Sequence, residues 1–187
     1  ALAAKFNKRK EQKYGELRAV NSLAEKLRAR ARHSVERVFN DLARSISFID
    51  APDIRINDGG PDRENSHWYR FEVGESAKDA GKYANFNEAH YFVKASIRVG
   101  PERLVLVISL HHVGRELTGI MEATAFARME SFENSEDREL VSRAFFICSR
   151  EPFVFTWRTE EDAIGAAFDR WLEAALAVAI KESGYRL

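Results

Sequence analysis

A single cysteine, Cys148, stands in this chain of 187 residues. One thiol cannot close an internal disulfide, and it excludes a zinc site built on cysteines. Its scarcity is typical of a reducing compartment, so we predict a cytoplasmic location. The residues before it, 145–147, are all apolar, which predicts a buried and unreactive thiol.

Several other signals are missing. No apolar run approaches the roughly 18 residues of a membrane-spanning helix, so we predict no membrane partner. The chain has no phosphate-binding or dinucleotide-binding glycine loop, no nucleophile elbow and no two-histidine zinc helix. Acidic residues in the glycine-rich segment 57–65 offer oxygen ligands, but their spacing does not match a calcium-binding EF-hand loop. We therefore predict no metal and no cofactor.

The chain as a whole carries no net charge, but its two parts carry opposite net charges. The formal net charge is zero, so no global field favours nucleic acid or a membrane surface. Residues 1–46 hold 12 Lys and Arg against 5 Asp and Glu, a net charge of +7. The remaining residues hold 17 against 24, a net charge of −7. The basic character of the chain is thus concentrated at its start.

Residues 2–46 show the period of one long helix, because apolar residues from Phe6 to Ile46 recur mostly at three- and four-residue steps. Such a helix is about 65 Å long, which exceeds the width of a small domain. We expect its second half to pack on a domain formed by residues 47–187, and its first half to project or to pair with another chain. The chain begins with Ala1 rather than Met, and we expect it to be part of a longer protein.

The basic residues of this helix allow two interpretations. They form a solvated helix face, or they contact phosphates or an acidic partner. The candidate nucleic-acid-binding residues are Lys5, Lys8, Arg9, Lys10, Lys13, Lys26, Arg28, Arg30 and Arg32.

Residues 90–113 predict a β-hairpin around which the domain is organised. Apolar and mixed residues alternate on both sides of the turn at 100–103, so one face belongs to the core. The turn predicts a register in which Val99 faces Leu104, Ile97 faces Leu106, Ala95 faces Ile108, Val93 faces Leu110 and Tyr91 faces His112.

Further elements follow from the same patterns. We expect strands around Ile54 and Ile56, at 67–73 and at 144–157, the last with a bulge, bend or edge position at Pro152. Residues 117–132 allow two interpretations: Met121, Ala125 and Met129 have helical spacing, but the alternation of side chains after a short turn favours a strand. Residues 74–89 predict an irregular excursion. A final helix begins after Thr159, which is predicted to cap it, and stops at Gly184. The fold class is α+β: a mostly antiparallel meander of five or six strands with a long N-terminal helix and a C-terminal helix packed on the sheet.

The mixed face of the hairpin is the candidate ligand-binding surface, because cations beside aromatic side chains on a sheet suit phosphate contact and stacking. Its candidate residues are His90, Phe92, Lys94, Arg98, Ser109 and His111, with Trp68 and Arg70 from a neighbouring strand. His112 should point to the core side. The histidines also permit a structural role or an incomplete metal or acid–base site.

Three functions remain open on the sequence. The first is a non-enzymatic recognition or regulatory module, which binds a ligand or partner on the mixed sheet face and associates with a protein partner or with itself through the N-terminal helix. The second is a nucleic-acid-binding protein that uses the basic helix. The third is a hydrolase that uses His90, His111 or His112, although no residue is assigned a catalytic role.

Overall fold

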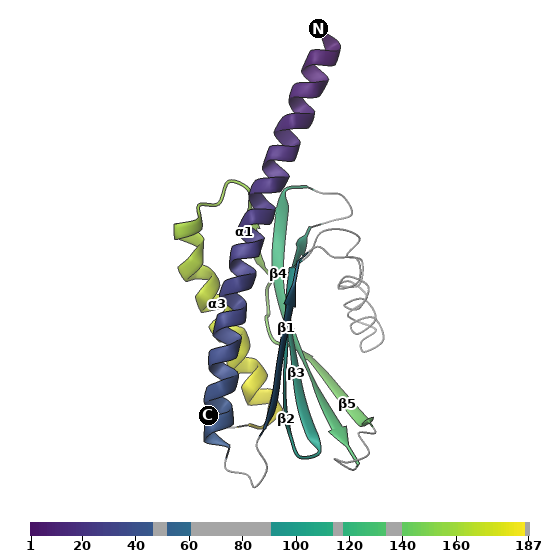
Figure 1. Ribbon diagram of the computed structural model, residues 1–187, viewed down its shortest axis with the longest axis vertical. Coiled ribbons are helices and arrows are strands. Elements are labelled where there is room, and N and C mark those ends of the chain that lie inside the picture. The colour runs from purple at the N-terminus through teal and green to yellow at the C-terminus, as the bar shows by residue number, and fades with distance from the viewer. Residues whose placement is uncertain (47–51, 61–90, 114–117, 134–139, 186–187) are drawn as a thin grey trace.

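The computed structural model describes residues 1–46, 52–60, 91–113, 118–133 and 140–185. It confirms the predicted α+β class, with a long N-terminal helix, an antiparallel sheet and a C-terminal helix (Figure 1). In chain order the elements are α1 (Leu2–Ser45), β1 (Asp53–Gly59), β2 (Tyr91–Val99), β3 (Glu102–His112), β4 (Ile120–Phe132), β5 (Leu140–Ile147), β6 (Phe153–Thr156) and α3 (Glu161–Ser183).

The sheet is an antiparallel meander in the order β1-β2-β3-β4-β5. Strand β4 is long enough to carry two strands on one edge: its second half pairs with β5, and its first four residues pair with β6. The single strand predicted at 144–157 is therefore wrong, since residues 148–152 separate two strands. Pro152 lies in that break, where its missing N–H costs no ladder hydrogen bond.

The strand predicted at 117–132 is confirmed as β4. The short strand at Ile54 and Ile56 is confirmed as β1, which also includes Asn57 and Asp58, so the predicted loop begins later. The strand predicted at 67–73 and the excursion at 74–89 lie outside the described residues.

The hairpin between β2 and β3 has the predicted faces but a different register. Ile97 pairs with Leu104 and Val93 with Ile108, two residues away from the prediction. The loop has only two residues, Gly100 and Pro101, and Gly100 has φ of +58°. Glycine with positive φ at the first position of a two-residue loop is typical of a type II′ turn, which suits the twist of a hairpin. A shift of two residues keeps every side chain on its predicted face.

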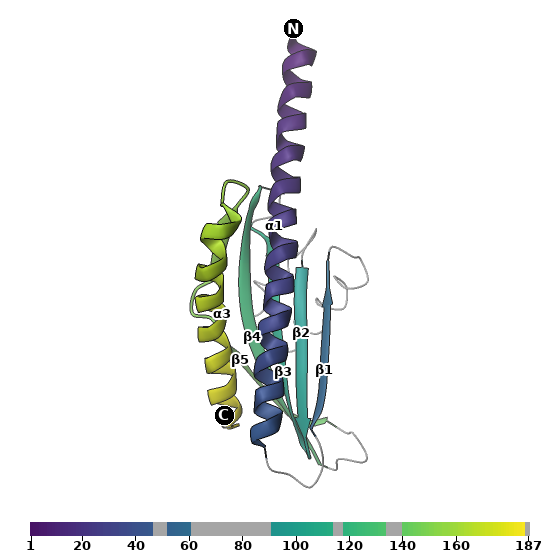
Figure 2. The same ribbon diagram turned by 60° about the vertical axis from the view of Figure 1, so that its left-hand side comes forward.

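Both helices lie against one face of the sheet, which we call the inner face (Figures 1 and 2). The core forms between that face and the apolar sides of α1 and α3. Its largest fully buried side chains include Phe39 from α1, Phe168 from α3 and Phe155 from β6. Burying each such ring removes enough apolar surface from water to stabilise the fold by about 2–3 kcal/mol.

Helix α1 packs along only part of its length. Residues 1–14 are exposed, and the first buried residue is Leu17. We call residues 1–14 the arm; it projects beyond the sheet in both views (Figures 1 and 2). Phe6, which the helical period assigned to the apolar stripe, is 68% exposed. The division of the chain into units at residue 46 stays a prediction.

The predicted C-terminal end of α3 is confirmed, but the predicted N-terminal cap is wrong. Gly184 ends the helix with φ of 76°, a left-handed conformation that glycine adopts without steric cost. Thr159 does not cap the helix: Glu160 holds the N-cap position without a side-chain bond. The Thr159 hydroxyl instead accepts a hydrogen bond from the backbone N–H of Thr156 at 3.0 Å, which closes the turn after β6.

Candidate anion-binding site

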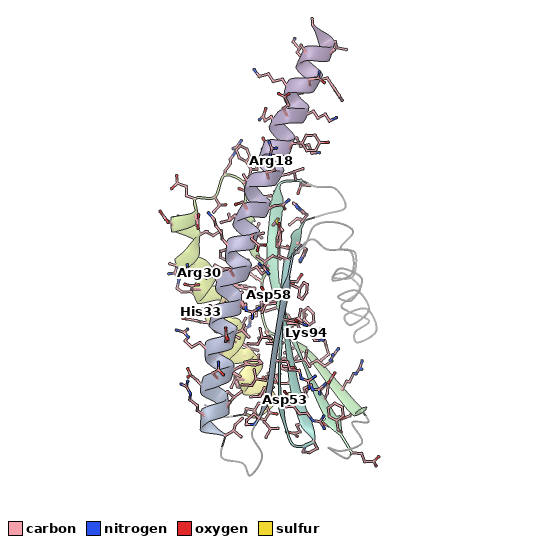
Figure 3. All side chains as sticks on the ribbon, in the orientation of Figure 1. Arg18, Arg30, His33, Asp53, Asp58 and Lys94 are labelled. Carbon is pink, nitrogen blue, oxygen red and sulfur yellow. The ribbon has the colours of Figure 1, made fainter. Side chains whose placement is uncertain are left out.

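The face of the sheet turned away from the helices, here the outer face, collects the mixed residues of every strand. Directly paired residues share a face, so Asn57, Lys94, Val107 and Phe126 form one row across the sheet. Figure 3 shows Lys94 on the side of the sheet opposite to α1. The outer face therefore includes the mixed face of the hairpin, which was predicted to bind a ligand, and continues over β1, β4 and β5.

A pocket of about 410 Å³ opens on this face. Its volume falls in the range of sites that hold small ligands. The lining residues are Arg55, Asn57, Lys94, Ser96, Arg103, Val105, Arg128, Glu130, Phe132 and Arg143. Five cations and one carboxylate give the lining a formal charge of +4, although residues 47–187 together carry −7. The pocket is thus a local positive site in the acidic part of the chain.

Ion pairs hold several of these cations in place. Glu130, only 5% exposed, lies 2.8 Å from the Arg128 guanidinium and 3.6 Å from that of Arg103. At the edge of the sheet Arg55 pairs with Asp53 at 3.0 Å. Arg143 forms no ion pair with another described residue. Glu130 therefore serves two of these arginines and Asp53 serves one, so among the described residues the lining has more cations than carboxylates.

The aromatic ring of Phe132 lines the pocket near the turn between β2 and β3 and contacts two arginines. The Arg98 guanidinium lies 4.7 Å from the centre of the Phe132 ring, and that of Arg103 lies 5.3 Å from it. The Phe132 backbone N–H donates to the Pro101 carbonyl at 2.7 Å, which fixes the ring beside the hairpin turn. Contact between a guanidinium and an aromatic face restricts the side chain while leaving its charge intact.

The predicted ligand-binding residues are only partly brought together. Lys94 lines the pocket, and Arg98 lies next to it through Phe132. Phe92, Ser109 and His111 are buried elsewhere on the outer face. Trp68, Arg70 and His90 lie outside the described residues. Sequence reasoning missed Arg55, Arg103, Arg128 and Arg143; the signal that would have found them is the alternation along each paired strand.

A second polar cluster lies further along the outer face. His111 Nε2 is 2.9 Å from a Glu122 carboxylate oxygen, and this hydrogen bond lowers the pKa of Glu122. Ser109 and Thr124 pair across β3 and β4 beside them, and both hydroxyls are buried with no hydrogen-bond partner among the described residues. None of the four lines the basic pocket. The described residues contain no group of three or more His, Cys, Asp or Glu able to hold a metal ion.

His112 lies on the inner face, as predicted. Its Nε2 is 3.1 Å from the Asn21 side-chain oxygen of α1, so it joins the sheet to the helix. Burial lowers the pKa of His112, and the neighbouring His111 lowers it further. The neutral imidazole is therefore the form that the fold stabilises.

This burial predicts a pH-dependent stability. Because the folded protein holds a proton on His112 more weakly than the unfolded chain does, the free energy of unfolding should fall as the pH drops below about 6.5. His112→Gln should reduce the loss between pH 8 and pH 5.5, measured by urea denaturation. The control is His33→Gln on the exposed side of α1, which should keep the wild-type pH dependence. Equal pH dependence in wild type and His112→Gln would contradict the assignment.

The candidate nucleic-acid-binding residues of α1 fall into two groups. In the packed half, Lys26 pairs with Glu161 and Arg30 with Asp169, which tie α1 to α3; Arg28 and Arg32 both pair with Asp58 of β1 (Figure 3). The Arg30 pair is bidentate, at 2.6 and 2.7 Å, and it lowers the pKa of Asp169. In the arm, the other candidates are all exposed: Lys5, Lys8, Arg9, Lys10 and Lys13.

Cys148 is buried, and burial raises the pKa of its thiol to about 12. The predicted burial of the thiol is therefore confirmed, and its raised pKa opposes formation of the thiolate. No helix that the structure describes is both long and apolar enough to cross a bilayer.

Comparison of the chain with protein-family models, curated proteins and solved structures finds no match. The residues of the site are therefore the basis for a proposed function.

Proposed function

We propose that this chain is a non-enzymatic recognition module of a larger protein or complex, and that its outer-face pocket binds an anionic group of a ligand or partner. The observation that carries the proposal is the lining charge of +4. Four of the five lining cations are arginines, whose planar guanidinium matches phosphate and carboxylate with two parallel hydrogen bonds. A cytoplasmic location stays part of this proposal.

Contacts within the protein orient some of the pocket arginines before a ligand binds. Arg103 and Arg128 are already oriented by Glu130, and Arg103 also rests on Phe132. Cations that are held before the ligand arrives lose less conformational freedom when it binds. This arrangement favours binding, since the described lining residues are mostly cations and include no histidine or cysteine.

Removing two pocket cations should weaken anion binding. We expect wild-type protein to bind inorganic tripolyphosphate in calorimetry at low salt, and Arg103→Gln/Arg143→Gln to bind it about tenfold more weakly, which corresponds to about 1.4 kcal/mol. Glu130 keeps its closer partner Arg128 in this variant, so the fold should persist.

The matched control is Arg170→Gln/Lys181→Gln, which removes two exposed cations from α3 on the opposite layer. It changes the net charge by the same amount and should change the affinity by less than about twofold, because exposed charges beyond about 10 Å are screened. No tripolyphosphate binding by wild type, or equal losses in both variants, would refute the proposal.

The arm supports a second candidate, nucleic-acid binding. Residues 1–14 carry five cations and one carboxylate, and none of them forms an ion pair with a described residue. Lys10 rests on the Tyr14 ring at 5.8 Å, which leaves its charge exposed. The same charge opposes self-association of two arms side by side, since like charges repel. A protein partner on the arm is therefore proposed to be acidic.

A further inference from the structure

Two of the lining arginines lie on either side of one strand, in the same row of the sheet. Arg103 of β3 is in register with Glu130 of β4, and Glu130 is in register with Arg143 of β5, so the three share a row on the outer face. Neighbouring strands lie about 4.8 Å apart, which places the Cα atoms of the two arginines about 10 Å apart. The other three lining cations lie two or four residues along the strands from this row. We call Arg103 and Arg143 the arginine pair.

The guanidinium of Arg103 is held over β4, towards Arg143. It lies 3.6 Å from a Glu130 carboxylate oxygen and 5.3 Å from the centre of the Phe132 ring, and both of these residues belong to β4. Arg143 is on the adjacent strand and its side chain is exposed. An anion that accepts hydrogen bonds from Arg103 above β4 is therefore about one strand spacing from the Arg143 backbone, within reach of that long side chain.

The carboxylate between the two arginines is compensated by another residue. Arg128 lies 2.8 Å from Glu130, and both side chains are almost fully buried, so these two form an ion pair without net charge. Arg103 is further from Glu130, and Arg143 forms no ion pair with another described residue. Because guanidinium groups stay protonated, the arginine pair offers two positive charges to a ligand.

Two guanidinium groups on one anion favour a phosphate over a carboxylate. Each guanidinium can donate two parallel hydrogen bonds, and a carboxylate has only two oxygens to accept them. A phosphomonoester has three terminal oxygens and a charge of about −1.5 to −2 at pH 7, so it can accept from both arginines and match their charge. A phosphodiester has two free oxygens and a single charge, and it matches neither property.

We infer that the ligand of the outer-face pocket is a phosphomonoester whose phosphate is bound between Arg103 and Arg143. This inference rests on the proposed function, because it names the anionic group that the same pocket binds. The pocket volume of about 410 Å³ leaves room beside a phosphate for its substituent. Asn57 from β1 and Ser96 from β2 also line the pocket and offer neutral hydrogen-bonding groups, so we expect the substituent to be polar.

Competition against tripolyphosphate tests the charge and the number of oxygens. Ethyl phosphate is expected to displace tripolyphosphate from wild-type protein in calorimetry at low salt and pH 8, with a Kd on the order of 1 mM. Diethyl phosphate and propionate each have one charge and two free oxygens, and they should compete about tenfold more weakly or not at all. This series uses the unaltered protein, so it tests the inference independently of any variant.

Two single substitutions locate the phosphate. Arg143→Gln should weaken ethyl phosphate binding about tenfold, because one guanidinium is lost. The fold should persist, since Arg143 forms no ion pair with another described residue. The matched control is Arg55→Gln, which removes another lining arginine four strands away, at about 19 Å. It should change the affinity for ethyl phosphate by less than about twofold, because charges at that distance are screened.

Each outcome has a distinct meaning. If tripolyphosphate binds but ethyl phosphate does not displace it, or propionate competes equally well, the inference is overturned and the proposed function stands. Equal losses in Arg55→Gln and Arg143→Gln also overturn it. Failure of wild-type protein to bind tripolyphosphate overturns both.

A short phosphoserine peptide distinguishes two sources of the phosphomonoester. Binding more than about tenfold tighter than that of ethyl phosphate would assign the ligand to a phosphorylated side chain of a partner, because contacts beyond the phosphate must then contribute. Binding equal to or weaker than that of ethyl phosphate would assign it to a small phosphorylated molecule. In both cases the phosphate is the group that the arginine pair binds.

Discussion

Replacing Phe39 by alanine is expected to lower the free energy of unfolding by about 3–5 kcal/mol, the usual cost of truncating a buried aromatic ring. Phe39 is fully buried between α1 and the sheet, among the largest side chains of the core. Its loss leaves a cavity that surrounding helices and strands cannot fill without moving. Urea denaturation followed by circular dichroism measures the change.

The same substitution in the arm should have almost no effect. Phe6→Ala removes an equal ring from the same helix, but Phe6 is 68% exposed, so we expect a change within about 0.5 kcal/mol. A small effect at Phe39 would mean that the packed half of α1 contributes little to the core. A large effect at Phe6 would mean that the arm is covered by another surface in solution.

This pair of residues also shows what the helical period can and cannot predict. The period correctly places one helix over α1. It also assigns the exposed Phe6 to the apolar stripe, because apolar spacing records which side of a helix is apolar and not whether a sheet lies beneath it. The end of the sheet, which is set by strands far along the chain, decides that packing begins at Leu17.

The hairpin illustrates a related limit. Alternation predicts the faces of β2 and β3 correctly, but a shift of two residues leaves alternation unchanged. The register depends on the length of the turn, and the left-handed Gly100 closes it in two residues instead of four. A prediction from side-chain pattern alone cannot distinguish these turns.

The basic pocket was the hardest feature to predict. Within one strand Lys94 is a single cation on a mixed face, typical of any solvent-facing sheet. The basic lining of the pocket emerges only when five strands are placed side by side, since each contributes one cation. Conversely, Lys26, Arg28, Arg30 and Arg32 look like a phosphate-binding face in sequence, but the structure places acidic partners from α3 and β1 beside them.

The partner shared by two of those arginines gives the second large expected effect. Asp58 is 13% exposed and pairs with Arg28, itself 17% exposed, and with Arg32 (Figure 3). Asp58→Ala leaves the Arg28 guanidinium partly buried with Glu25 as its remaining partner. We expect the free energy of unfolding to fall by about 2–3 kcal/mol, somewhat less than for a fully buried pair that loses one partner.

An exposed ion pair between α1 and α3 provides the comparison. Lys26 and Glu161 are each more than half exposed, so Glu161→Gln should cost less than about 1 kcal/mol, and the cost should shrink in high salt. The cost of Asp58→Ala should persist in high salt, because its main origin is an uncompensated charge shielded from solvent. If both substitutions cost the same, Asp58 is an ordinary surface carboxylate. Arg28 and Arg32 would then be available to an acidic partner, and the basic face of the packed half would again compete with the pocket as a binding surface.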